Sequence, residues 1–140
     1  MAAQIFNQTI EGYWRFINKE GISDYSGVYF VYEAHYNSDT DTVTLLRLIY
    51  IGEANNIRDR IATHEKNNEW STYVRPGNEI CFSTCYADGI IRSRIEAAYI
   101  FQHKPDINTD YKYLFPFDQT TVISSGKTAL LNTNFTIYRT

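Results

Sequence analysis

Long hydrophobic runs and targeting segments are missing from this sequence of 140 residues. A transmembrane helix needs about 20 consecutive apolar residues, and the apolar runs in this chain are all short. No signal peptide is visible at the N-terminus. We therefore expect a soluble protein of the cytoplasm that makes no contact with a membrane.

Cysteine is also scarce, and both cysteines, Cys81 and Cys85, lie in the segment ICFSTCYA. This segment is expected to be a strand, which would place both thiols on one face but too far apart along it for a disulfide. Two cysteines without a nearby pair of histidines or further cysteines do not make a zinc site. We expect buried, reduced thiols.

Positive charge is not in excess, because the formal net charge is −3 and the isoelectric point is about 5.5. A dedicated DNA-binding domain is usually basic, so this balance argues against tight non-specific binding of nucleic acid by the whole surface. A local basic patch is still compatible with it. Several cations fall in one part of the chain, namely Arg58, Arg60, Lys66, Arg75, Arg92, Arg94 and Lys104.

A glycine is missing from the one triplet that invites comparison with a P-loop. Gly126, Lys127 and Thr128 would need a glycine five residues before Gly126, and position 121 is threonine. The chain also contains no internal repeat and no low-complexity segment. These absences exclude a P-loop nucleotide site and a repeat architecture.

The residues that are present describe a single packed domain, residues 1–140. Hydrophobic residues make up 44% of the chain and aromatic residues 16%, which is typical of a globular protein with a buried core. Twelve tyrosines are many for this length. Because tyrosines can pack, donate hydrogen bonds or stack on bases, their number alone does not identify a function.

Residue patterns along the chain predict both strands and helices. In segment 1–24, Trp14 and Ile17 lie three apart and Gly21 follows, which predicts a short N-terminal helix. The other predicted elements are an antiparallel hairpin of strands at 27–36 and 42–52, a helix at 54–67, a strand at 79–87, a helix at 89–103 that Pro105 ends, and two strands in the tail 111–140.

One stretch, LIYIGEANNIRDRIATH from Leu48 to His64, combines a short apolar strand with the start of a helix. The strand is expected to turn at Gly52, and Asn55 or Asn56 can cap the helix. Within the helix, Ile57 and Ile61 lie four apart on one face, and Arg60 and His64, also four apart, lie beside them. A cation and an imidazole along a buried stripe are unusual enough to suggest a site.

The same stretch contains Tyr50-Ile51-Gly52, and Gly27-Val28-Tyr29 stands at the head of the preceding strand. Further residues follow at fixed distances: Arg60 eight residues after Gly52, His64 one helical turn later, Glu96 in the second expected helix, and Asn108 twelve residues after it. In this order and spacing they resemble the GIY-YIG nuclease family over roughly residues 26–110.

The resemblance implies a small α/β (α+β) domain with a three-stranded antiparallel sheet flanked by helices. This chain would add a helix-like segment at 1–24 and a β extension at 111–140. The implied activity is that of an endonuclease that hydrolyses phosphodiester bonds in DNA with Mg²⁺ or Mn²⁺ as its cofactor. Two features depart from the family: the loop between the motif halves is long, and Glu53 stands where many members have a lysine.

The implied catalytic residues each have a chemical role. Glu96 would hold the metal ion, and Arg60 would clamp a phosphate, because a guanidinium matches two phosphate oxygens. His64 would orient the water or shuttle a proton. By family likeness Tyr29 is the candidate general base and Tyr50 its partner. Without the resemblance, the tyrosines would be sheet aromatics, Glu96 a solvated helix residue, Arg60 a salt-bridge partner and His64 a structural histidine.

Further residues would support this site. Gly27 and Gly52 would give tight turns and a close approach of substrate, and Asn108 would orient Glu96 or brace its loop. DNA contacts would come from flanking cations: Arg58, Lys66 and Arg92. Because these cations are few, a homodimer or a partner protein would supply specificity. The alternative function is a catalytically inactive module that keeps the fold and binds nucleic acid or protein.

Overall fold

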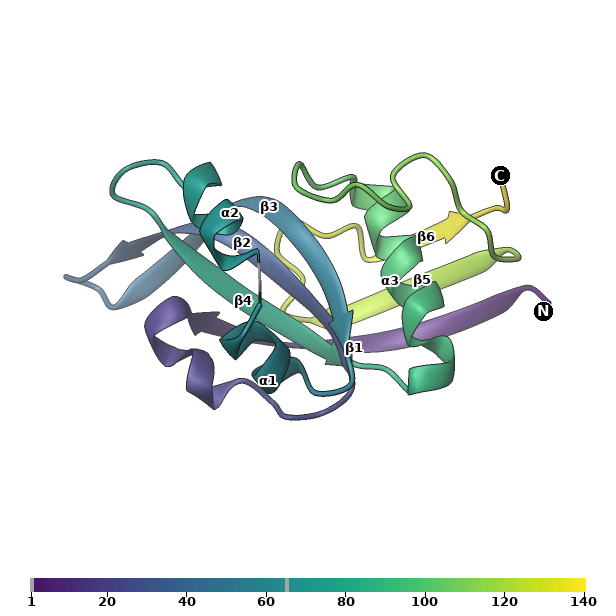
Figure 1. Ribbon diagram of the computed structural model, residues 1–140, viewed down its shortest axis with the longest axis horizontal. Coiled ribbons are helices and arrows are strands. Elements are labelled where there is room, and N and C mark those ends of the chain that lie inside the picture. Colours follow the sequence, from purple (N-terminus) through teal and green to yellow (C-terminus); the bar gives the residue numbers. More distant parts are fainter. Residues whose placement is uncertain (1, 65) are drawn as a thin grey trace.

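The computed structural model describes residues 2–64 and 66–140, so Met1 of the expected N-terminal segment and Glu65 of the expected helix lie outside it. Its main feature is a six-stranded mixed sheet that curls into a half-barrel (Figure 1). The strands are β1 (Gln4–Arg15), β2 (Gly27–Asn37), β3 (Thr42–Ala54), β4 (Glu79–Tyr86), β5 (Thr120–Gly126) and β6 (Asn134–Ile137). The helices are the 3-10 helix η1 (Phe16–Gly21), α1 (Ile57–Ala62), α2 (Asn67–Tyr73) and α3 (Gly89–His103).

The strands follow the order β3-β2-β4-β1-β5-β6 across the sheet. Neighbouring strands are antiparallel except for β1 and β5, which are parallel. The prediction of a three-stranded antiparallel sheet flanked by helices is therefore wrong, because β1, β5 and β6 extend the sheet beyond β4. The three strands of the predicted sheet are present as β3-β2-β4, with β2 in the middle.

The N-terminal segment accounts for most of this difference. In segment 1–24, where a short helix was predicted, residues 4–15 instead form β1 between β4 and β5. The predicted helix is present only as the 3-10 helix η1, which ends at the predicted Gly21. Gln8 and Ile10 are buried while Thr9 between them is exposed, which is the two-residue period of a strand. The three-residue spacing of Trp14 and Ile17, which suggested a helix, spans the end of β1 and the start of η1.

Several other elements are confirmed. The hairpin of β2 and β3, the strand β4 and the antiparallel pair β5 and β6 lie where they were predicted. Helix α3 has the predicted bounds and ends at His103, and the next residue, Lys104, takes a left-handed conformation with φ 46° directly before Pro105. A proline disfavours helical backbone in the residue before it, which explains this end.

The helix predicted at 54–67 is wrong, because the chain forms two short helices with His64 between them. The side chain of Asn56 caps α1 by accepting a hydrogen bond from the Asp59 amide at 3.1 Å. The predicted apolar face is confirmed, since Ile57 and Ile61 are both fully buried.

Side chains pack on both faces of the sheet, and β2 shows this most clearly. Phe30 and Tyr32 belong to a cluster with Tyr99 of α3, whereas Tyr29 and Val31 belong to a second cluster with residues of α1 and α2. The two clusters alternate along β2 because successive side chains of a strand point to opposite faces. Figure 1 shows α3 away from α1 and α2 accordingly.

The expectation for the cysteines is confirmed. Cys81 and Cys85 are both buried and free. Burial raises the pKa of each thiol to about 12, so both are unreactive thiols at neutral pH. Among residues 2–64 and 66–140, no helix is long and apolar enough to cross a membrane.

Candidate active site

Three of the predicted site residues bring their rings together at the ends of β2 and β3. The Tyr29 ring lies 6.3 Å from the ring of Tyr50 and 6.0 Å from that of His64, measured between centroids. Tyr50 and His64 are 5.6 Å apart. Trp70 of α2 packs 4.6 Å from His64, and it is fully buried. The cluster therefore joins two strands to α2 and to the connection before it.

Two predicted glycines lie inside the sheet where a larger side chain would not fit, and Gly52 is the one that touches the ring cluster. A Cβ atom on Gly52 would lie 2.4 Å from the Tyr29 hydroxyl oxygen, and one on Gly27 would lie 2.0 Å from the carbonyl oxygen of Cys85. Both residues are within paired strands, with Gly52 two residues before the end of β3. The prediction that they form tight turns is wrong; they allow close packing instead.

Arg60 of α1 is exposed, and its guanidinium donates a hydrogen bond to the buried hydroxyl of Tyr29. Burial raises the pKa of Tyr29, and Tyr50 adds to this, while the charge of Arg60 and its hydrogen bond to the phenol oppose the rise. The negative charge of Glu96 raises the pKa further, and the net pKa is well above the ordinary value. Tyr29 is therefore a neutral phenol at neutral pH.

His64 has a defined orientation although it lies outside the helices. It is 3% exposed, and its Nδ1 accepts a hydrogen bond from the backbone amide of Lys66 at 2.9 Å. A neutral imidazole that accepts at Nδ1 has its proton on Nε2. In this form His64 can donate a hydrogen bond from Nε2.

Glu96 approaches the cluster from α3, on the other face of the sheet. Burial raises the pKa of its carboxyl to about 8, with further contributions from the charges of Glu53 and Asp110, and Arg92 opposes them. Oxygen donors that repel one another in this way suit a hard divalent cation such as Mg²⁺. Among the described residues, however, no three His, Cys, Asp or Glu side chains group closely enough to hold a metal.

Asn108 braces the edge strand β3 and does so with its side chain. Its Oδ1 accepts from the amide of Ile51 at 2.9 Å, and its Nδ2 donates to the carbonyl of the same residue at 2.8 Å. The amide of Ile107 donates to the carbonyl of Ile49 at 3.1 Å. Residues 107 and 108 thus bond to Ile49 and Ile51, the residues on either side of Tyr50. Asn108 therefore holds in place the strand that carries Tyr50.

The flanking cations are held by protein groups. Arg92 donates to Glu53 at 2.5 Å, to Asn55 at 2.8 Å and to Ser26 at 2.9 Å. Ser93 donates to the second oxygen of Glu53 at 2.5 Å. Glu53, the residue that departs from the family pattern, therefore neutralises and fixes Arg92.

The other two predicted DNA contacts are less constrained. Arg58 donates to the carbonyl of Ile22 at 2.6 Å, and the Nζ of Lys66 lies 3.3 Å from the carboxylate of Glu69. The ion pair of Lys66 is solvent-exposed and is therefore weak. Both side chains are partly exposed, and Arg58 also lies 3.9 Å from the carboxylate of Asp24.

Two hollows lie against the predicted residues. One, of about 510 Å³, is lined by Glu53, Ala54, Asn55, Asn56, Asp59, Arg60, Thr63 and Arg92. The other, of about 110 Å³, is lined by Tyr50, Lys66, Glu96, Ile100, Ile107, Asn108, Thr109, Asp110 and Tyr111. Arg60 therefore faces the wider hollow and Glu96 the narrower one.

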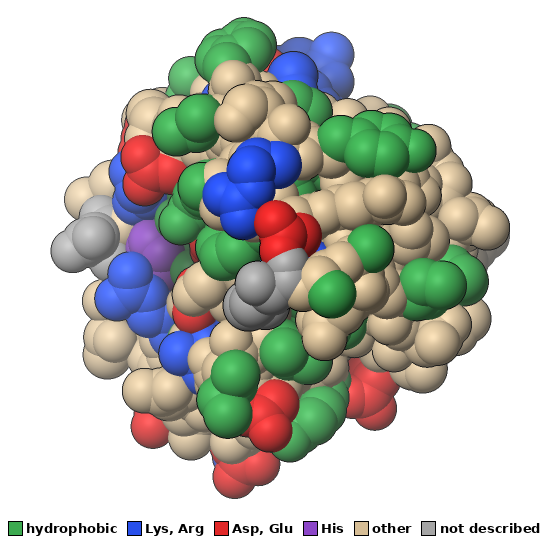
Figure 2. All heavy atoms as spheres, turned by 90° about the vertical axis from the view of Figure 1, so that its right-hand side faces the viewer, with side chains coloured by type: hydrophobic (Ala, Val, Ile, Leu, Met, Phe, Trp, Pro, Cys, Tyr) green, Lys and Arg blue, Asp and Glu red, His purple; other side chains and the backbone are tan. Residues whose placement is uncertain are grey.

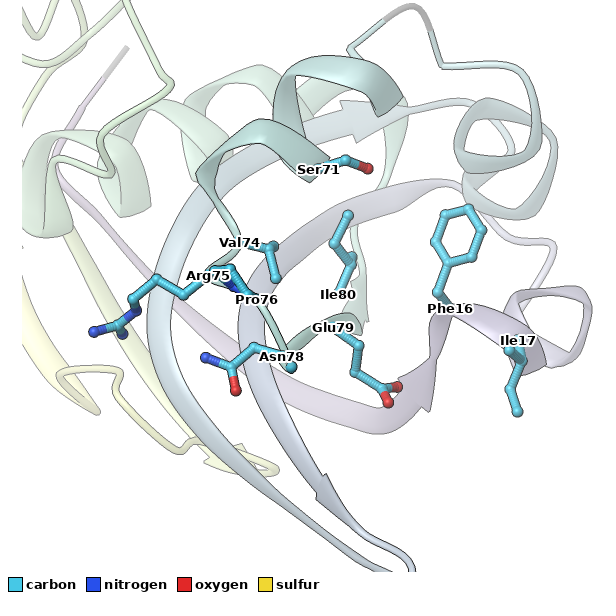
Figure 3. A pocket seen from close by; sticks show the side chains of 10 residues that line it. Phe16, Ile17, Ser71, Val74, Arg75, Pro76, Asn78, Glu79 and Ile80 are labelled. Carbon is cyan, nitrogen blue, oxygen red and sulfur yellow. The ribbon is translucent and has the colours of Figure 1, made fainter.

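A third hollow, of about 460 Å³, contains none of the predicted site residues. Phe16 and Ile17 lie on one side of it and Val74 to Ile80 on the other (Figure 3). We therefore place the candidate active site at the first two hollows.

No protein-family model, curated protein or solved structure matches this chain. The site is therefore interpreted from its own chemistry.

Three residues of the site, Trp70, Asp110 and Tyr111, were not predicted from the sequence. For Trp70 a signal was present, because Trp70, Tyr73 and Val74 have the spacing of one helix face. Asp110 and Tyr111 lie in a loop that bends back to α3, which no local pattern reveals.

Proposed function

We propose that this chain is a divalent-metal-dependent endonuclease that hydrolyses phosphodiester bonds in DNA, and that it is related to the GIY-YIG nucleases. The observation that carries the proposal is the hydrogen bond of Arg60 to Tyr29. The phenol of Tyr29 is also close enough to Glu96 for the charge of that carboxylate to raise its pKa. These residues come from three separate elements, and Tyr50 and His64 complete the group. Their convergence supports a shared chemical task.

Each side chain has a role that its surroundings favour. Glu96 would hold Mg²⁺ or Mn²⁺, and the ion would stabilise negative charge on the phosphate and activate water. Arg60 would bind two phosphate oxygens, because it is exposed beside the wider hollow. His64 would donate a hydrogen bond from Nε2, since its Nδ1 is occupied.

Tyr29 could contribute either as a neutral phenol or as a deprotonated general base, and its surroundings determine which form is favoured. As a neutral phenol it donates a hydrogen bond to substrate or water. To act as a general base it must lose its proton, which burial opposes and the charge of Arg60 favours. A cation on Glu96 would remove the negative charge that now raises the pKa of Tyr29, so both positive charges would favour the base form.

A second candidate function is a non-catalytic module that binds nucleic acid or protein. The observation that favours it is the ion pair of Arg92 with Glu53, which removes one cation from the surface of the site. The net charge of −3 also disfavours tight binding of DNA.

For either function, a homodimer or a partner protein is proposed to add contacts. A measurement of solution mass with and without DNA tests this proposal.

Plasmid nicking distinguishes the two functions. We expect nicking with Mg²⁺ or Mn²⁺ and none with EDTA. Arg60→Lys keeps the charge but loses the two-pronged hydrogen bonding, so its rate should fall by roughly 100-fold, as when other transition-state donors are removed. Glu96→Gln should abolish the metal-dependent rate. Arg139→Lys is the matched control, because Arg139 binds Asp118 elsewhere on the surface.

The outcomes separate clearly. Wild-type binding without cleavage in any divalent ion would favour the non-catalytic module. Cleavage by Arg60→Lys at the wild-type rate would remove Arg60 from the site, and cleavage that persists in EDTA would contradict the metal dependence.

A further inference from the structure

The loop that follows α3 places two lysines and two tyrosines beside the candidate active site. Lys104 directly follows α3, and its Nζ lies 3.9 Å from the ring centroid of Phe101 and 5.5 Å from that of Tyr113. The same Nζ donates to the carbonyl of Phe101 at 2.5 Å. The ammonium group is therefore held between two aromatic rings at the surface.

The outer part of this loop is both aromatic and basic. Tyr113 is 78% exposed, although a tyrosine is usually better buried. Lys112 precedes it in the chain. Burial lowers the pKa of Lys104, and the charge of Lys112 lowers this pKa further. Within the described part of the chain, neither lysine forms an ion pair with an acidic side chain.

Tyr111 connects this outer part to the site. It lines the same narrow hollow as Glu96, and its ring lies 6.4 Å from that of Phe117. Its φ of 62° is in the left-handed region, which side chains other than glycine seldom adopt. Lys104, with φ 46°, is in the same region, so strained backbone marks both ends of this connection.

We propose that Lys104, Tyr111, Lys112 and Tyr113 form a platform for the unpaired nucleotides of a DNA strand that leads to Glu96. This inference rests on the proposed function and names the form of its substrate. The lysines would contact phosphates, and a base would stack on the exposed ring of Tyr113. Within the platform, Tyr111 would lie nearest the reacting phosphate, because it lines the same hollow as Glu96.

Unpaired DNA fits this surface better than a duplex for two reasons. A duplex hides the faces of its bases, so an exposed tyrosine can stack only on a base that is out of the helix. A duplex is held mainly through many phosphate contacts, and the net charge of this chain is −3. On the face in Figure 2, basic and acidic side chains are interspersed, and hydrophobic side chains form separate patches.

Binding measurements in Ca²⁺, which should occupy the site without cleavage, test the platform. The probes are a fluorescent oligothymidylate and a blunt duplex of equal length. Tyr113→Ala should weaken oligothymidylate binding about 10-fold, the loss of one stacked base, with no change in salt dependence. The double variant Lys104→Gln/Lys112→Gln should lower the salt slope by about 0.7 for each lysine. Duplex binding should change less than oligothymidylate binding in both variants.

Matched controls lie on other elements. Lys19→Gln removes a lysine whose Nζ lies 4.2 Å from the Phe16 ring on η1, and Tyr36→Ala removes a tyrosine near the tip of the β2–β3 hairpin. Both elements are well away from the α3 end of the molecule in Figure 1. Both controls should bind oligothymidylate as the wild type does. Equal losses in the controls, or wild-type binding by Tyr113→Ala, would overturn the proposal.

Photo-crosslinking locates the strand directly. An oligothymidylate that carries iodouracil should crosslink to the peptide containing Tyr111 and Tyr113, and mass spectrometry identifies that peptide. Crosslinks confined to other tyrosines, or a wild-type preference for the duplex, would overturn the platform. A protein that binds and crosslinks as expected but cleaves in no divalent ion would retain the platform and lose the nuclease assignment.

Discussion

Gly52 has no side chain, and the phenol ring of Tyr29 occupies the space where one would lie. Gly52→Ala would place a methyl group 2.3 Å from the Cζ atom of Tyr29, so the ring must move or the strands must separate. We expect a loss of roughly 1–3 kcal/mol in the free energy of unfolding, the usual cost of overpacking. Cleavage should also fall, because Tyr29 loses its position beside Arg60.

The matched control is Gly89→Ala, at the exposed start of α3. Its nearest neighbour would be the Nη1 atom of Arg92 at 3.7 Å, an ordinary contact. Alanine also favours helix over glycine, so this variant should be as stable as the wild type or slightly more so. Urea unfolding of both variants decides the matter. A Gly52→Ala protein of wild-type stability would mean that Tyr29 does not depend on this gap.

The raised pKa of Glu96 predicts how the stability of the protein depends on pH, and this prediction is independent of catalysis. Its pKa in the folded protein is about 8 against an ordinary value of 4.5. The folded state therefore holds its proton more tightly, and its stability falls as pH rises from 4.5 to about 8. Glu96→Gln lacks this penalty and should be more stable than metal-free wild type at the upper end of that range, by roughly 1–3 kcal/mol.

Thermal unfolding across that pH range measures the effect. The difference between the two proteins should disappear below pH 4.5, where the wild-type carboxyl is protonated in both states. Mg²⁺ should raise the melting temperature of the wild type and leave that of Glu96→Gln unchanged, because only a bound ligand stabilises the folded state. A variant that is less stable than the wild type at high pH would show that Glu96 is a structural residue.

At the scale of elements, Glu33 of β2 fixes the loop that follows α2. It is fully buried and accepts hydrogen bonds from the amide and guanidinium of Arg75, at 2.9 Å and 3.1 Å, and from Asn78 at 2.8 Å. Arg47 lies 3.2 Å away and donates to the carbonyl of Tyr73, the last residue of α2. The network therefore holds α2, and with it Trp70, against the sheet.

Burial raises the pKa of Glu33, but the hydrogen bonds from Arg75 and Asn78 outweigh it and lower the pKa to about 2. The stability that this carboxylate contributes is complete above its ordinary value of 4.5 and is lost as pH falls towards about 2. Glu33→Gln should destabilise the protein at neutral pH by roughly 1–3 kcal/mol, because the buried side chain at position 33 loses its charge-assisted hydrogen bonds from Arg75 and Asn78.

Urea unfolding from neutral to acid pH tests this prediction, with Glu20→Gln on the exposed side of η1 as the control. The gap between wild type and Glu33→Gln should narrow as the pH falls, while the control follows the wild type throughout. A gap that stays constant with pH would contradict the role of the charged carboxylate.

The elements that sequence predicted correctly are those with a strong local signal. α3 has a cap at Asp88 and a stop at Pro105, and β2 and β3 are rich in β-branched and aromatic residues around a polar turn. The helix predicted at 54–67 failed because periodicity does not show where a helix is interrupted. Thr63 donates to the carbonyl of Asp59 at 3.0 Å, and α1 ends there, which places His64 in a connection.

At the scale of the whole molecule, the sequence could not predict how the two ends of the chain join one sheet. β1 and β5 are parallel neighbours more than a hundred residues apart, and only tertiary pairing reveals them. The buried guanidinium of Arg94 shows how far α3 depends on those ends. It donates to Thr120, Gln4 and the carbonyls of Ala2, Asp118 and Gln119, at 2.8–3.2 Å.

The segment that resembles the nuclease family, residues 26–110, should therefore not fold by itself. Every acceptor of Arg94 among the described residues lies outside it, so the fragment loses the hydrogen bonds that tie α3 to residues 2–4 and 118–120. The apolar face of α3 would also lose Ile10, Val122 and Phe135, which complete its cluster.

We expect circular dichroism of fragment 26–110 to lack a cooperative thermal transition, whereas the full chain unfolds in one step. A second measurement keeps the test independent of aggregation. In the full chain, Arg94→Met should lower the free energy of unfolding by roughly 3–5 kcal/mol, because several buried acceptors lose their donor at about 1–3 kcal/mol each. Arg139→Met, at an exposed arginine, should change it far less. A fragment that unfolds cooperatively, together with an Arg94→Met protein of wild-type stability, would show that the strands outside 26–110 are dispensable additions to a smaller domain.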